Sequence, residues 1–179
     1  MVVNAITDMQ IQELRAVARR SLARMYLPDR GLFAFRLCRK VDDLCLEGIS
    51  RRYTAIVLTG LVGEASQDVA TILHGNTPHD VCGDLLKSID QSDDLGEVAL
   101  TLWAARAHGH PEANRARDKL KALHPETGAF PTVELAWSLK ALLVGDHPGD
   151  ETALAESLAR RLLYSFQFQS ALFPHWPAD

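Results

Sequence analysis

The chain has 179 residues, of which 47% are hydrophobic and 23% are charged, and this composition is typical of one folded domain. Its net charge of −4 and its isoelectric point near 6 exclude the basic surface with which proteins bind nucleic acids, so we expect no nucleic-acid partner. The longest apolar run, 55–63, is too short to cross a bilayer, and residues 1–8 lack a secretory signal. These features predict a cytoplasmic protein with no membrane partner.

The number and spacing of the cysteines indicate the redox compartment of the protein and whether a disulfide or metal site is expected. Cys38, Cys45 and Cys82 are an odd number without close pairing, which argues against a disulfide framework and is typical of a reducing compartment. The sequence has no Cys-x-x-Cys motif, and the nearest histidine pair, His108 and His110, falls at a predicted helix junction. We therefore expect buried or half-buried thiols, no metal site and no cofactor.

Apolar residues recur at helical spacing along most of the chain. From a capping-box sequence at Thr7, this spacing predicts a helix to residue 26, which Pro28 and Gly31 end. A short extended stretch and then charged residues follow over 32–43, where we predict a loop. Further helices are predicted over 49–61, 66–73, 78–89, 95–107, 110–123, 131–142 and from Asp150 onward. No strand of useful length is predicted, so the predicted fold class is all-α.

Polar-faced helices alternate with apolar ones along the chain, which is the pattern of an outer layer around an inner layer. The apolar helices are those over 49–61, 95–107 and 131–142. Three turns that follow polar helices also align, since each leads to an aromatic residue that can fill the gap between layers: Phe33, Phe130 and Phe173. The repeat predicts one domain over 1–179, in which about three and a half antiparallel helix pairs form a partial α/α toroid or solenoid.

Two segments, Leu22 to Phe35 and Glu126 to Leu143, resemble the repeats of the terpenoid cyclase and protein prenyltransferase superfamily. Those repeats consist of an outer helix, a Gln/Asp-Gly-aromatic turn and an apolar inner helix, and complete members close a ring of such pairs. The resemblance implies that this chain is an incomplete ring with a central cavity for its ligand. Related toroids act on sugars, so the resemblance predicts the shape of the chain better than it predicts a reaction.

Candidate site residues lie near the ends of the predicted inner helices, where a toroid holds its substrate. Paired carboxylates can act as acid and base, and we predict these roles for Glu97 and Glu134, assisted by Asp94 and Tyr53. The alternative is that the three carboxylates cap helix N-termini and complement the helix dipoles. The predicted ligand-binding residues are the other charged and aromatic side chains near these ends: Arg51, Asp93, Trp103, Trp137, His175 and Trp176. For the two inner-helix tryptophans, core packing is the alternative.

Two functions of different classes are compatible with these features. One is a module that binds a small or extended organic ligand on a concave, acid- and aromatic-lined surface, in one version as part of a terpenoid-, prenyl- or carbohydrate-processing enzyme. The other is a non-catalytic helical scaffold for protein–protein interaction. Exposure of Glu97 and Glu134 in one cavity favours catalysis, whereas pairing with basic residues favours the scaffold. The apolar segment 164–176 further predicts a homo-oligomer or a missing C-terminal portion that covers it.

Overall fold

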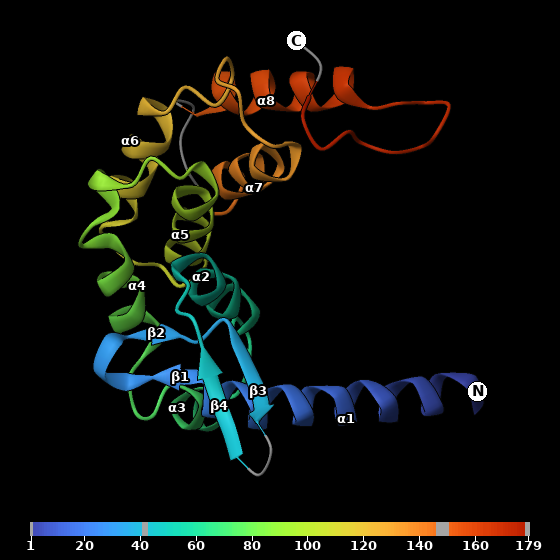
Figure 1. Ribbon diagram of the computed structural model, residues 1–179. Coiled ribbons are helices and arrows are strands. Elements are labelled where there is room, and N and C mark those ends of the chain that lie inside the picture. Colours follow the sequence, from blue (N-terminus) through green and yellow to red (C-terminus); the bar gives the residue numbers. More distant parts are fainter. Residues whose placement is uncertain (1, 41–42, 146–150, 178–179) are drawn as a thin grey trace.

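The computed structural model describes residues 2–40, 43–145 and 151–177, and most of this part of the chain is helical (Figure 1). Two short 3₁₀ helices are η1 (Pro28–Arg30) and η2 (Ile89–Gln91). The α-helices have the following bounds: α1 Val2–Met25, α2 Arg51–Gly60, α3 Ser66–Ile72, α4 Pro78–Leu86, α5 Leu95–Ala107, α6 Ala113–Ala122, α7 Thr132–Leu142 and α8 Thr152–Ser165. Among the described residues, no helix is both long and apolar enough to cross a membrane.

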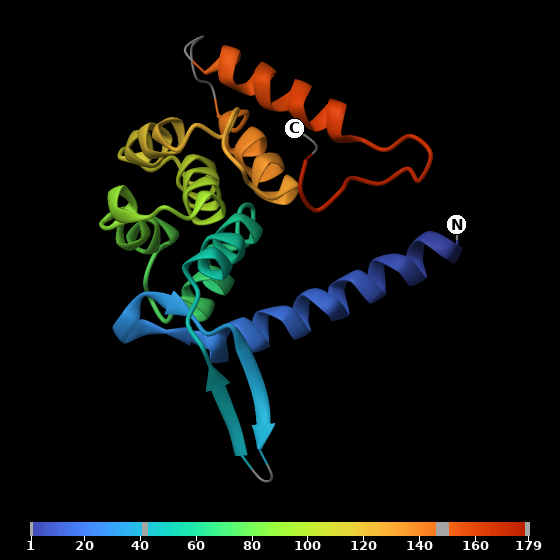
Figure 2. The same cartoon turned by 45° about the horizontal axis from the view of Figure 1, so that its top comes forward.

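The helices form two curved layers (Figures 1 and 2). Helices α2, α5 and α7 make an inner row, in which α5 packs against α2 and α7. Helices α4, α6 and α8 lie outside this row, where α6 packs against α5 and α8 against α7. Because the row is curved, α1 and the C-terminal segment project from the same side of the molecule. The alternation of apolar and polar-faced helices thus corresponds to an inner and an outer layer.

Helix starts follow their cap residues closely. Asp94 accepts a hydrogen bond from the backbone N–H of Glu97, and α5 has the bounds predicted from the sequence. Thr77 and Asp80 form a capping box at the start of α4. Ser50 caps α2, which therefore begins two residues later than predicted.

The two ends of the helical region differ from the predicted bounds. The first helix extends back to Val2, beyond the predicted cap at Thr7. The predicted start of the last helix at Asp150 lies outside the described residues, and α8 follows Glu151.

The prediction of an all-α fold is wrong, because the chain contains two small antiparallel sheets. In the first, β1 (Tyr26–Leu27) pairs with β2 (Leu32–Phe33) around η1. Tyr26 and Phe33 are opposite each other and buried, with ring centroids 5.0 Å apart. Gly31 closes the turn at φ +62°, where a side chain would also come within 2.7 Å of Asp84 Oδ2.

The second sheet replaces part of the predicted loop and extends beyond it. Strand β3 (Arg36–Lys40) pairs with β4 (Asp43–Glu47) in a register that places Cys38 opposite Cys45. This β3–β4 hairpin projects from the helical body (Figures 1 and 2). Its residues are half-buried or exposed, so the alternation of apolar and polar residues that identifies a half-buried strand is missing. The description of the chain as a toroid built from helix pairs alone is wrong for the same reason.

The core consists of two adjoining clusters of buried side chains. Ten residues of α5 are buried, which agrees with its prediction as an inner helix. The apolar sequence over 49–61 predicts a buried inner helix, but α2 is buried only in part, because Tyr53 and Ile56 are exposed on it. The reason is that α2 lies at the end of the inner row, so it has an inner-helix neighbour, α5, on one side only.

The three aligned turns place their aromatic residues differently. Phe33 is buried, and Phe130 is partly buried against the core cluster around α5 and α7. Phe173 is half exposed, because no further inner helix follows it among the described residues. Two of the three aromatic side chains therefore fill the space between layers as predicted.

Candidate functional site

The N-terminal ends of the three inner helices meet around one side chain, that of Arg52 in the first turn of α2. Its Nε donates to both carboxylate oxygens of Asp94, at 2.8 and 2.9 Å, and its Nη2 donates to Glu134 Oε1 at 2.6 Å. Asp94 is the N-cap of α5, and Glu134 lies in the first turn of α7. One guanidinium therefore connects all three inner helices.

The close approach of this guanidinium depends on Gly96. A Cβ atom at that position would lie 2.7 Å from Cζ of Arg52, much closer than two carbon atoms can approach. The glycine has no unusual φ angle, so its role here is to leave space and not to relieve the backbone. The first turn of α5 is thus shaped to receive the side chain of Arg52.

A second ion pair lies beside the first. Arg51 Nε donates to Glu97 Oε1 at 2.6 Å, and Arg51 Nη2 donates to the backbone carbonyl of Leu85 at the end of α4. The structure therefore brings together Glu97, Glu134, Asp94 and Arg51, four of the residues predicted for the site. We call these four residues and Arg52 the inner-helix ion cluster.

Burial and charge determine what the inner-helix ion cluster can do. The Glu134 side chain is 9% exposed and that of Glu97 16%, whereas that of Asp94 is 41% exposed. Partial burial alone would lower the pKa of Arg52, but hydrogen bonds to Asp94 and Glu134 outweigh it and the pKa is raised. Each carboxylate accepts a charge-assisted hydrogen bond from an arginine, an arrangement suited to holding helix ends together.

Two other predicted site residues lie outside this cluster. Tyr53 is exposed on α2, and its ring packs edge-on against Phe35, with centroids 5.1 Å apart. The Asp93 side chain is 92% exposed and forms a surface pair with Lys119 of α6 at 3.2 Å. Tyr53 was predicted to assist the carboxylates and Asp93 to bind a ligand, but the observed contacts of both are with other parts of the surface.

The predicted aromatic ligand-binding residues are divided between two places. Trp103 and Trp137 are partly buried and pack against both core clusters, and Lys140 Nζ lies 5.6 Å from the ring of Trp103. This agrees with the core-packing alternative. His175 and Trp176 lie in the C-terminal segment, with ring centroids 5.4 Å apart.

A pocket of about 380 Å³ lies between α7 and the C-terminal segment, and His175 is one of its lining residues. Thr132 holds the two walls together: its N–H donates to the carbonyl of His175 at 2.8 Å, and its hydroxyl donates to that of Pro174 at 2.6 Å. The rest of the lining is mainly apolar and consists of Val133, Ala136, Leu162 and Phe173. Pockets of this size in proteins accommodate small organic molecules.

Sequence reasoning missed Arg52, although a signal was present. Two arginines in the first turn of α2 lie where the helix dipole disfavours positive charge, so each of them needs carboxylate partners. The sequence interpretation chose Arg51 and assigned no role to its neighbour. Which acid each arginine meets depends on the packing of α2, α5 and α7.

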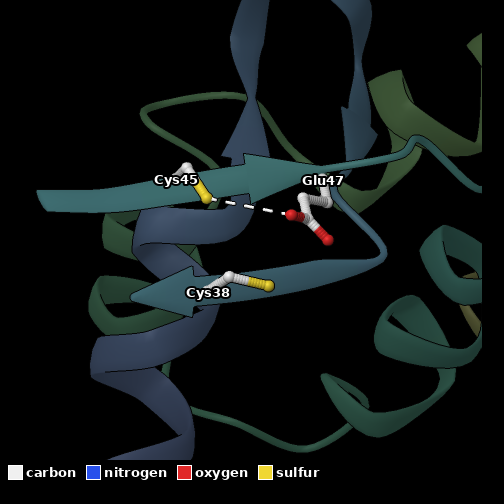
Figure 3. Close-up of side chains that lie close together, drawn as sticks. All are labelled: Cys38, Cys45 and Glu47. Atoms are coloured by element: carbon white, nitrogen blue, oxygen red, sulfur yellow. Dashed lines mark hydrogen bonds between the residues drawn. The ribbon is translucent and has the colours of Figure 1, made fainter. Parts of the chain in front are cut away.

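One group among the described residues has side chains suited to a metal ion. Cys38, Cys45 and Glu47 place their ligand atoms within 4.8 Å of one another on the β3–β4 hairpin (Figure 3). All three side chains are half-buried. The sequence interpretation expected no metal site, because it considered close cysteine and histidine spacings along the chain and not cysteines that strand pairing brings together.

Comparison of the chain with protein-family models, with curated proteins and with solved structures found no match. The resemblance to terpenoid cyclases and prenyltransferases gains no support from these comparisons, and we propose no activity from it.

Proposed function

We propose that this chain is a non-catalytic helical scaffold that associates with a second copy of itself. The observation that carries the proposal is a group of large apolar side chains that are each more than half exposed at the end of α8 and in the segment after it. We call this group the C-terminal apolar surface, and its members are Leu163, Tyr164, Phe168, Leu172, Phe173 and Trp176. Contiguous apolar surfaces of this kind usually mark interfaces.

The C-terminal apolar surface is built on a defined loop. The N–H of Gln167 donates to the carbonyl of Leu172 at 2.9 Å, which closes the loop. The ring centroid of Phe166 lies 5.0 Å from those of Phe168 and Phe173. The aromatic side chains are therefore fixed in relation to one another, so little conformational freedom remains to be lost when a partner binds.

A second apolar surface lies on α1, which projects from the helical body and on which Ile11, Leu14 and Val17 are exposed. Helix α1 packs against α3 only over part of its length, and isolated helical segments shorter than about 12–15 residues are marginal in water, so a contact on the apolar side of its projecting part would stabilise it. Helix α1 and the C-terminal segment project from the same side (Figure 2). Two copies related by a twofold axis can therefore cover both surfaces at once.

The area is adequate for such a pair. With roughly 100 Å² of exposed surface for each of the six side chains, the C-terminal apolar surface supplies about 600 Å² per copy. The pair would then bury about 1,200 Å² before any contribution from α1, which is the lower limit for a stable interface.

The inner-helix ion cluster supports the non-catalytic part of the proposal. A general acid or base must be free to exchange a proton with the substrate, whereas Glu97, Glu134 and Asp94 are all engaged with arginines. Pairing of these carboxylates with basic residues favours a scaffold over a catalytic site. We further place the scaffold in the cytoplasm, because its three cysteines are an odd number without close pairing along the sequence, which is typical of a reducing compartment.

The test is the mass of the full chain in solution, measured by light scattering coupled to gel filtration at micromolar concentration. We expect twice the mass of one chain for the unmodified protein and a single-chain mass for the Phe168→Asp/Phe173→Asp variant. The matched control is Leu44→Asp/Leu46→Asp, which introduces the same two charges at exposed apolar residues of the β3–β4 hairpin. A monomeric unmodified protein, or a control that dissociates equally, would contradict the proposal.

A second candidate function is the binding of a small apolar ligand in the pocket between α7 and the C-terminal segment. Its size and mainly apolar lining support this candidate. The fluorescent probe anilinonaphthalene sulfonate tests it, because Ala136→Trp would fill the pocket and abolish the fluorescence increase. The same change at Ala159, which lies at a different pocket beside α8, is the control. Equal fluorescence in all three proteins would exclude a specific site.

A further inference from the structure

The β3–β4 hairpin presents three potential metal ligands on one face, and the strand register explains why. Cys38 is directly opposite Cys45 in the antiparallel ladder, so their side chains point to the same face. Glu47 follows Cys45 by two residues on β4, which places its carboxylate on that face as well (Figure 3). Backbone pairing therefore places the three side chains on the same face of the hairpin.

The distances are close to those of a metal site. All three ligand atoms lie within 4.8 Å of one another, and Cys45 Sγ is 4.0 Å from Glu47 Oε1. A tetrahedral zinc ion with bonds of about 2.3 Å to sulfur needs its two sulfur atoms about 3.8 Å apart. The observed separations of up to 4.8 Å exceed this value by no more than about 1 Å, which is within the range that rotation about side-chain bonds covers.

Neighbouring cations set the electrostatics of this face. Arg36 Nε donates to Cys38 Sγ at 2.8 Å, and Arg36 Nη2 lies 3.0 Å from Glu47 Oε2. Lys40 Nζ is 3.6 Å from the other carboxylate oxygen of Glu47. Arg36 and Lys40 thus hold the side chains of Cys38 and Glu47 by hydrogen bonding and charge. The side chains of Arg36 and Lys40 are more than half exposed, so they can turn to solvent when a metal ion takes their place.

We propose that Cys38, Cys45 and Glu47 form a zinc site, in which the three side chains bind the ion and water occupies the fourth position. Two thiolates and a carboxylate are donors that zinc accepts, and three protein ligands with one open position are common around this ion. Each cysteine loses its thiol proton to solvent when its sulfur binds, and no electron is transferred.

A cross-link between its two strands would stabilise the β3–β4 hairpin. It projects from the helical body, and an isolated two-stranded hairpin is at best marginally stable in water. A metal ion that joins both strands at Cys38 and Cys45 and extends to Glu47 would fix the register of the ladder. Metal binding would then be coupled to ordering of the hairpin.

The test uses the full chain, kept reduced and freed of metal with a chelator. Cobalt(II), a spectroscopic substitute for zinc, should give a thiolate-to-metal charge-transfer band that saturates at one ion per chain and that zinc removes. Cys38→Ser and Cys45→Ser should each weaken zinc binding by about 100-fold or more, beyond the loss of an outer-shell partner. Glu47→Gln should weaken it less and keep the charge-transfer band. Cys82→Ala is the matched control, since this thiol is buried in a core cluster and takes no part in the β3–β4 pairing.

Two results would overturn the proposal. One is the absence of a charge-transfer band in the reduced, unmodified chain. The other is a band that survives in the Cys38→Ser/Cys45→Ser double variant or disappears in Cys82→Ala. Circular dichroism of each variant checks that the helices are intact, which we expect because the hairpin lies outside both core clusters.

Discussion

Replacing Arg52 by methionine is the most direct test of the inner-helix ion cluster. Methionine retains an apolar side chain that can pack beside Gly96, but it removes the guanidinium that joins Asp94 and Glu134. If the cluster holds the inner helices together, the variant must lose stability. If the carboxylates are instead an active site, stability should change little.

The magnitude follows from the exposure of the two acids. The Asp94 side chain is 41% exposed, so water screens this pair and its loss costs at most about 1 kcal/mol. The Glu134 side chain is 9% exposed, and losing a charged hydrogen bond there costs about 1.5–3 kcal/mol. We expect the free energy of unfolding to fall by about 2–4 kcal/mol in total.

Urea unfolding, followed by far-ultraviolet circular dichroism, measures this difference. Lys119→Met is the matched control, since it removes a similar pair whose acid, Asp93, is 92% exposed, and it should cost less than about 1 kcal/mol. The double variant Arg52→Met/Glu134→Met removes the unpaired carboxylate and should recover part of the lost stability. The reasoning is refuted if Arg52→Met is as stable as the unmodified chain, or if the double variant is no more stable than the single one.

Three further predictions concern other charged and thiol groups. Hydrogen bonds from Arg15 and Arg19 of α1 lower the pKa of Glu64. The ionised carboxylate of Glu64 therefore stabilises the fold fully above its unfolded-state pKa, and this stabilisation is lost as the pH falls through its folded-state pKa. The Glu64→Gln variant should therefore lose less stability than the unmodified chain over the same acid range, and thermal unfolding measures this difference. Burial raises the pKa of the Cys82 thiol to about 12, so Ellman's reagent should titrate the two hairpin thiols in the folded chain and Cys82 only after denaturation. Glu151→Ala leaves the guanidinium of Arg106, which is 1% exposed, without its carboxylate, and urea unfolding should show a loss of about 3–5 kcal/mol.

Local features of the sequence were sufficient to predict most of the helices. Asp94 fixes the start of α5 and Thr77 that of α4, because a cap acts on N–H groups only two or three residues away. The alternation of apolar and polar-faced helices also predicted which helices form the inner layer. Burial in this fold follows helix periodicity, and that signal is present in any short window of the chain.

The hairpin and the ion cluster could not be predicted in the same way. Arg52 is 42 residues from Asp94 and 82 from Glu134, and only the packing of α2 against α5 and of α5 against α7 brings these charges within hydrogen-bond distance. The hairpin is held by backbone pairing with little burial, so its side chains carry no periodic signal. Cys38 and Cys45 become neighbours only when the strands pair in their observed register. The sequence alone determined where helices begin and which faces are apolar, because those depend on near neighbours, whereas tertiary structure decided which charges and thiols meet.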